Sequence, residues 1–177
     1  MTEQAIKSVQ LWLENIVIGL NLCPFAKREW TKNRIRFSVS DADSEEGLLR
    51  ILNSELELIF ADDSIETTLI IVPDLLKDFY EYNQFLDLAD RLIEQMDFTG
   101  IFQIASFHPY YQFDGTDSDD VENYTNRSPL PILHILREDS LERAIANYTD
   151  ADKIPERNIA LLQEMGLVKV IKLLKNE

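Results

Sequence analysis

The residues best suited to chemistry are two histidines, His108 and His134, and both lie in the stretch 103–138. A histidine can move protons near neutral pH, hold a metal or donate to an anion. His108 follows an apolar run and precedes Pro109, so we expect it at a solvent-facing strand end. The alternative there is a structural histidine that hydrogen-bonds the loop. His134 lies inside an apolar run, and its alternative to catalysis is a core histidine.

Two arginines of the same stretch, Arg127 and Arg137, flank a double-proline segment. A guanidinium recognises carboxylate or phosphate groups through paired hydrogen bonds, and neighbouring prolines stiffen the loop that holds it. The pattern therefore favours an anion site. The alternative is that the arginines form internal salt bridges with Glu138 or Asp139.

A third candidate for chemistry is Cys23, which precedes Pro24. If a helical turn begins there, its positive end and the side chains of Lys27 and Arg28 would favour the thiolate. The alternative is a small buried hydrophobe. Residues 23–36 are basic within an acidic chain, which indicates either a local anion site or a solvated strand edge that carries Lys and Arg.

By residue type, His108 and His134 with Cys23 or an acid would suit a metal. However, the chain has no H-x-x-x-H, no H-E-x-x-H and no paired C-x-x-C spacing. The acidic loop at 114–120 lacks the ligand pattern of a calcium loop. Phosphate-loop, dinucleotide and nucleophile-elbow motifs are absent as well, so the sequence identifies neither a metal nor a cofactor.

The length, composition and charge of the chain limit the class of protein to which it can belong. The chain has 177 residues, 45% of them hydrophobic and 28% charged, with a net charge of −15. This fits a single globular domain over residues 1–177. The negative charge disfavours nucleic acid and anionic membranes as partners. With one cysteine, no signal peptide and no apolar run near the roughly 20 residues of a membrane span, we expect a cytoplasmic protein. The oligomeric state is left open.

Apolar periodicity predicts a strand–helix–strand–helix–strand order in the middle of the chain. Strands are expected at 35–40, 67–72 and 101–107, and helices at 4–20, after the cap at 43–46, at 77–96, from a cap at Asp139 to 148, and at 155–174 with a break at Gly166. Residues 110–131 form a long loop, and 131–137 fit a strand better than a helix. Such connections imply parallel neighbouring strands with right-handed crossovers. The predicted fold class is α/β: a mixed sheet of about four strands with helices packed against it. Ligands gather at the carboxyl ends of strands in such sheets, where His108 falls.

Several longer motifs carry a family resemblance. They are residues 19–26, 103–110 and 123–138, together with Phe79 and Tyr82-Asn83. They resemble the bacterial family catalogued as domain of unknown function 1415, over nearly the whole chain. The resemblance implies a site and no particular reaction: the Cys23–Pro24 turn, His108 and the segment 127–138 would belong to one unit. Leu130 stands where an aromatic residue is common in the family, which puts no role in doubt.

The leading hypothesis is an enzyme that acts on a small anionic metabolite bearing a phosphate or carboxylate. Arg127 and Arg137 would hold the anion with help from Lys27 or Arg28, His108 would move protons, and Cys23 or His134 would complete the site. One alternative is a non-enzymatic ligand-binding or protein-interaction module, and another is a metal-dependent hydrolase. An enzyme needs His108 and an arginine at one open cavity, whereas a scaffold would bury them against backbone carbonyls and acids.

Overall fold

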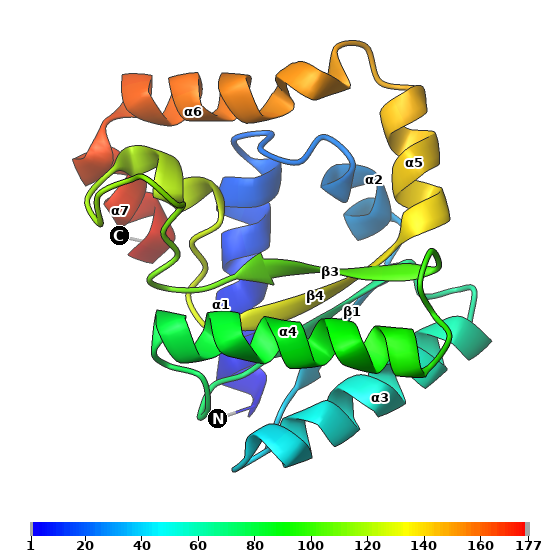
Figure 1. Cartoon of the computed structure of the whole chain (residues 1–177). Coiled ribbons are helices and arrows are strands. Elements are labelled where there is room, and N and C mark those ends of the chain that lie inside the picture. The colour runs from blue at the N-terminus through cyan, green and yellow to red at the C-terminus, as the bar shows by residue number, and fades with distance from the viewer. Residues whose placement is uncertain (1, 176–177) are drawn as a thin grey trace.

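The computed structural model describes residues 2–175, which form one four-stranded sheet with helices on both of its faces (Figure 1). The strands are β1 Ile35–Val39, β2 Thr67–Ile71, β3 Phe102–Phe107 and β4 Ile132–Arg137. Their order across the sheet is β1-β2-β4-β3. The predicted α/β fold with a mixed sheet is confirmed, and the segment after the double proline is a strand.

The strand directions agree with the sequence prediction only in part. β1 and β2 pair in parallel, whereas β4 pairs antiparallel with both β2 and β3. β1, β2 and β3 therefore run in one direction and end at the same edge of the sheet. The expected parallel neighbours are confirmed for β1 and β2 and are wrong for β2 and β3, because β4 lies between them. The loop after β3 returns the chain to the carboxyl edge, so the next strand enters in the opposite direction.

Two long helices, α3 (Glu45–Ala61) and α4 (Phe79–Gln95), cover one face of the sheet (Figure 1). Their apolar side chains form a continuous core with those of the strands, including Leu52, Phe85 and Leu133, none of which is exposed. The N-cap of α3 is Ser44, whose hydroxyl accepts a hydrogen bond from the Gly47 N–H (3.3 Å). The predicted cap at Asp43 is wrong by one residue, because Ser44 is the extended residue whose oxygen reaches the third N–H of the helix.

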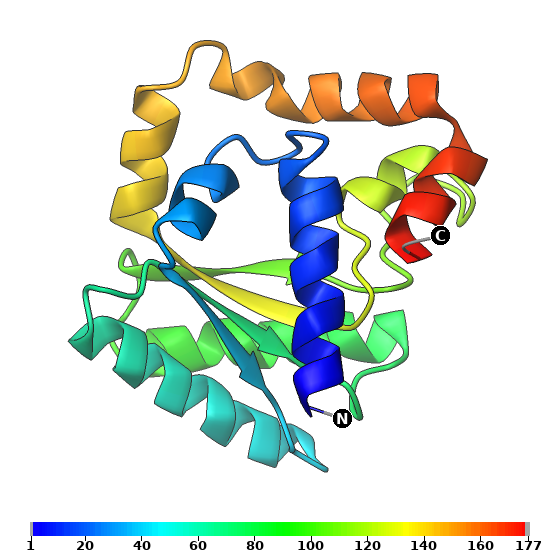
Figure 2. The same cartoon turned by 180° about the vertical axis from the view of Figure 1, so that it is seen from behind.

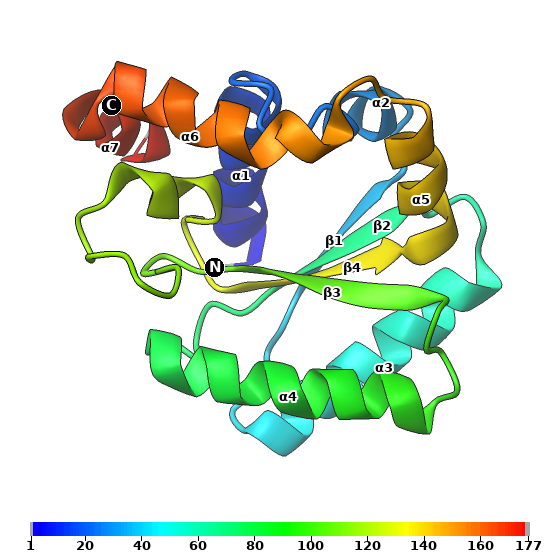
Figure 3. The same ribbon diagram turned by 45° about the horizontal axis from the view of Figure 1, so that its top comes forward.

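The other face carries the remaining helices (Figures 2 and 3). They are α1 (Thr2–Trp12), which continues as a π-helical segment (Leu13–Ile18), α2 (Ala26–Thr31), α5 (Glu138–Ala146), α6 (Ile154–Met165) and α7 (Leu167–Lys175), with single 3₁₀ turns at Val121–Thr125 and Ala151–Lys153. The break at Gly166 is confirmed. The predicted cap at Asp139 is wrong, because α5 follows β4 directly and has no side-chain cap. None of the described helices is long and apolar enough to cross a membrane.

The two faces of the sheet are not equally covered. β2 is buried along its whole length. On the face under α1 and α6, by contrast, Ala105, Phe107 and His134 stay half-buried, and Gln103 is exposed. All five residues of β1 are also half-buried, as suits a strand with only one neighbour.

Candidate functional site

His108 lies at the carboxyl end of β3, as predicted, but it is fully buried. Its Nδ1 accepts a hydrogen bond from the Tyr110 N–H (3.0 Å), so Nε2 carries the proton and donates to the carbonyl oxygen of Leu76 (3.0 Å). Burial lowers the pKa of His108 below its ordinary value. The ring is therefore neutral near pH 7, and both of its nitrogens are already bonded within the protein.

The His108 ring also fixes the turn between β2 and α4. Leu76, which accepts its hydrogen bond, has a φ of 55°, a left-handed conformation that a bulky residue adopts only when its surroundings impose it. The ring centroids of Phe79 and Tyr82, at the start of α4, lie 5.3 and 5.0 Å from that of His108. His108 thus joins the end of β3 to the start of α4.

The long loop after His108 is organised around Asn123, a fully buried residue that the sequence analysis did not single out. Its Oδ1 accepts hydrogen bonds from the Phe113 N–H and the Thr116 hydroxyl (both 2.9 Å), and its Nδ2 donates to the carbonyl oxygen of Asp117 (2.8 Å). The side chain replaces backbone pairing that the loop lacks. The only sequence signal was its place in a motif of the family resemblance.

Arg127 binds this loop rather than an anion. Its Nε donates to the carbonyl oxygen of Tyr111 (3.1 Å) and its Nη2 to that of Ser118 (2.6 Å). The guanidinium also lies 4.4 Å from the centre of the Tyr124 ring, in a cation–π contact. Neither alternative weighed from the sequence, an anion or an acidic partner in the next segment, describes these contacts.

Arg137 lies at the opposite edge of the sheet from His108. Its guanidinium donates to the carbonyl oxygens of Ile59, Asp62 (3.2 Å) and Ile65 (3.1 Å). Ile59 lies in the last turn of α3 and Asp62 is its C-cap, and carbonyls at this end have no partner within the helix. β4 starts near His108 and ends at Arg137, and a six-residue strand spans roughly 20 Å. The structure therefore does not bring the two residues together.

His134 lies in the middle of β4 on the face under α1. The Thr67 hydroxyl donates to the carbonyl oxygen of Ile135 (2.6 Å), so the His134 Nε2–H donates to that hydroxyl (2.6 Å). Burial lowers the pKa of His134 to about 4. His108 packs on the α4 side of the sheet, so the two histidines face opposite sides and do not form one constellation.

Cys23 lies in the turn before α2, packed among the apolar side chains under α1. Burial raises the pKa of its thiol, and hydrogen bonds to the backbone at Phe25 and Ala26 offset this only in part. The prediction that this position favours the thiolate is therefore wrong, because burial outweighs the local donors. Lys27 and Arg28 are exposed. Within residues 2–175, no three His, Cys, Asp or Glu side chains are grouped so that they would hold a metal ion.

The arginines of the basic segment 23–36 are neutralised by ion pairs. Arg36 donates to both carboxylate oxygens of Glu55 (2.7 and 3.0 Å), and Arg34 pairs with Glu66 at 2.8 Å. Burial alone would raise the pKa of Glu55, but hydrogen bonds from Arg36 and Ser38 lower it below its ordinary value. At Arg34 and Arg36 these ion pairs favour the alternative of a charged strand edge over an anion site.

The backbone of β1 is open along its outer side. In a parallel ladder both peptide groups of a residue point to the same side, and alternate residues point to opposite sides. The Arg34 carbonyl accepts from the Thr67 N–H, and the Ser40 N–H donates to the Ile71 carbonyl (2.8 Å), so even-numbered residues face β2. The peptide groups of Ile35, Phe37 and Val39 therefore point outward. Across the described chain, no turn or loop segment supplies them with a backbone partner.

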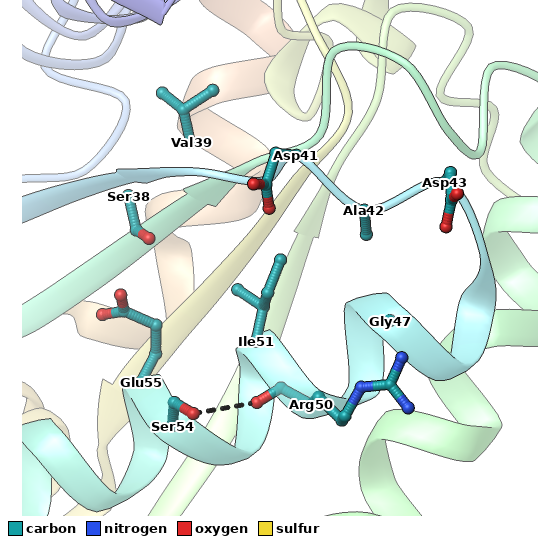
Figure 4. A pocket seen from close by; sticks show the side chains of 10 residues that line it. All are labelled: Ser38, Val39, Asp41, Ala42, Asp43, Gly47, Arg50, Ile51, Ser54 and Glu55. Carbon is teal, nitrogen blue, oxygen red and sulfur yellow. Dashed lines mark hydrogen bonds between the residues drawn. The ribbon is translucent and has the colours of Figure 1, made fainter.

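Two open pockets flank this edge. The larger, about 570 Å³, lies between β1 and the first half of α3 (Figure 4). Its lining consists of Ser38, Val39, Asp41, Ala42, Asp43, Gly47, Arg50, Ile51, Ser54 and Glu55. The smaller, about 290 Å³, lies at the start of β1 and is lined by residues 33–37, Ser64 and Ile65. The larger pocket has three acids and one arginine, which does not favour an anionic metabolite.

Comparison with known proteins places the chain in a family. Residues 4–172 match the family model described as a protein of unknown function, DUF1415, so the chain belongs to this family. No curated protein and no solved structure matches the chain. The resemblance noted in the motifs is thereby confirmed.

Proposed function

We propose that the protein is a non-enzymatic protein-interaction module whose docking edge is β1. The observation that carries this proposal is the open outer side of β1, with outward peptide groups at Ile35, Phe37 and Val39 and a pocket at each end. In strand addition, an extended segment of a partner pairs with such an edge. Main-chain hydrogen bonds then provide affinity, and pockets that receive alternate side chains provide specificity.

The contacts within the stretch 103–138 also support an interaction module rather than an enzyme. An enzyme acting on an anion would need His108 and an arginine at one cavity, but His108 is bonded at both nitrogens and Arg127 is bonded to loop carbonyls. In the proposed module, these side chains hold the long loop and the carboxyl edge of the sheet in one arrangement. We also propose that the protein is bacterial and cytoplasmic. Its motifs resemble those of a bacterial family, and its single cysteine cannot form the intrachain disulfides that are common in secreted proteins.

The test is a selection of displayed nine-residue peptides against the full chain, followed by affinity measurements on the enriched peptides. Val39→Pro removes an outward N–H and places a proline ring on the edge, whereas Val39→Ala shortens the same side chain and keeps the N–H. We expect the wild type and Val39→Ala to bind within about threefold of each other. Because each lost hydrogen bond and the ring oppose pairing, Val39→Pro should bind at least about tenfold more weakly.

Two results would contradict the proposal. One is a selection that enriches no peptide although the chain is monomeric in solution and its β1 edge is free. The other is enriched peptides that bind Val39→Pro as tightly as the wild type, since they would then use another surface.

A further inference from the structure

We infer that the segment that pairs with β1 is β1 of a second copy of this chain, antiparallel about a twofold axis at Phe37. This inference rests on the proposed role of the β1 edge and names its partner. The two sheets would join into one continuous sheet of eight strands, with β3 at each end.

The alternation of hydrogen-bonding directions along β1 supports pairing between two copies. The outward peptide groups belong to odd-numbered residues, Ile35, Phe37 and Val39. In an antiparallel pair, two directly opposite residues exchange both of their hydrogen bonds, and such pairs recur at every second residue. A twofold axis at Phe37 places Phe37 opposite its own copy and Ile35 opposite Val39 of the partner. Every outward N–H and C=O of both strands then has a partner.

The charges at the two ends of β1 are complementary in this arrangement. Lys32 precedes the strand, and Asp41 and Asp43 follow it. All three side chains are exposed, and none of them has an ion-pair partner within residues 2–175. Antiparallel pairing brings the basic end of one copy beside the acidic end of the other. A parallel pair would place like charges together.

The strand also lacks the features that protect a free edge. Natural edge strands carry lysine, proline or a bulge that prevents pairing with another chain. β1 has none of these, and its one charged side chain, Arg36, is bound by Glu55. On the α1 face, Phe37 is half-buried against Trp30, with ring centroids 6.1 Å apart. The twofold axis would set the two Phe37 side chains next to each other and cover more of both.

The first experiment is sedimentation velocity of the full chain over a range of concentrations. We expect a species of twice the 20.5 kDa chain mass. Val39→Ala should keep this species, and Val39→Pro should shift it to the mass of one chain. A wild type that stays at 20.5 kDa at the highest concentration would overturn the inference. So would a dimer that Val39→Pro leaves intact, because its interface would then lie elsewhere.

The second experiment tests the register with disulfides in a Cys23→Ser background, which removes the single native cysteine. Phe37→Cys places the two thiols at a hydrogen-bonded pair with Cα atoms about 5.5 Å apart, within disulfide range. Ser38→Cys places them two residues out of register, roughly 8 Å apart and beyond that range. We expect a covalent dimer from Phe37→Cys alone under mild oxidation. Equal cross-linking of both variants, or of Ser38→Cys alone, would overturn the register.

The outcomes separate this inference from the proposed function. A monomeric chain that captures peptides at the edge, with sensitivity to Val39→Pro, would overturn self-pairing and leave the interaction module standing. A monomeric chain that captures no peptide would overturn both.

Discussion

The stretch 103–138 and the edge strand β1 differ in how their polar groups are satisfied. In the first, His108, Asn123 and Arg127 direct their hydrogen bonds inward, to peptide groups of the turns and loops around them. In the second, the side chains are ordinary but the outward peptide groups of β1 have no backbone partner in the described chain. A concentration of reactive residue types therefore does not mark an available site here. The open edge used in the proposal belongs to β1, a strand with no unusual residues.

The difference has a physical cause. A loop of more than 20 residues carries many peptide groups that no ladder satisfies, and buried polar groups without partners are costly. Polar side chains inside the loop form these hydrogen bonds, so they are not free to bind a ligand. An edge strand has the opposite problem, because its ladder is complete on one side only.

The largest expected effect on stability is in the stretch 103–138. His108→Ala removes two hydrogen bonds and a ring packed against Phe79 and Tyr82, so we expect the free energy of unfolding to fall by about 3–5 kcal/mol. Denaturant unfolding at one low protein concentration measures it. Tyr110→Ala is the matched control, because Tyr110 is 68% exposed and the variant keeps the backbone N–H that donates to His108. Although the Tyr110 ring lies 5.9 Å from that of His108, the free energy of unfolding should change by less than about 1 kcal/mol. A small loss for His108→Ala would mean that the residue is not structural.

The next effect tests the two sides of β1. Ser38→Pro removes an N–H that points to β2, whereas Val39→Pro removes one that points outward. Relative to the alanine variant at the same position, we expect a loss of about 2–3 kcal/mol for Ser38→Pro and under about 1 kcal/mol for Val39→Pro. Equal losses in denaturant unfolding of the monomer would show that the outward N–H has an internal partner, which would remove the contrast between the two regions.

A smaller loss is expected at the far edge of the sheet. Arg137→Met keeps an apolar stem but removes the guanidinium that donates to the carbonyls of Ile59, Asp62 and Ile65, of which, among the described residues, only that of Asp62 keeps another donor, the Ile65 N–H (3.2 Å). This loss should cost about 2 kcal/mol. Arg143→Met is the control, because that side chain is 68% exposed and should matter by less than about 0.5 kcal/mol. If the two variants unfold alike by thermal denaturation, Arg137 does not stabilise the end of α3.

The smallest effect concerns pH. The pKa of His134 is about 4 in the folded chain and 6.5 in the absence of burial. Between these values the unfolded chain binds a proton that the folded chain does not, so the wild type loses stability as the pH falls from 7 to 4. The full shift corresponds to about 3.4 kcal/mol, and we expect about 1–2 kcal/mol because His134 is only half-buried.

His134→Gln does not titrate and should not show this loss. The stability advantage of the wild type over His134→Gln should therefore shrink toward pH 4. Gln103→Asn, on the same face and exposed, should keep a constant difference from the wild type. A pH-independent difference for His134→Gln would place the folded pKa of His134 near its ordinary value.

The sequence by itself determined the local elements and the fold class. Period-2 and period-3.6 apolar patterns depend on which face of an element is buried, so they located the buried strand at 67–72, the helix at 77–96 and the break at Gly166. The motifs also identified the family of the chain from residue types alone. Element boundaries were less accurate at Asp43 and Asp139, because a cap depends on the backbone conformation of one residue.

Only the tertiary structure decided what the polar residues do. The position of β4 between β2 and β3 followed from the path of a long loop, and it separated Arg137 from His108 by the length of a strand. Burial raised the pKa of Cys23 despite the nearby basic residues. The open edge of β1 likewise depends on which strands lie beside it. Each of these outcomes depends on neighbours distant in sequence, and a spacing pattern along one chain carries no information about them.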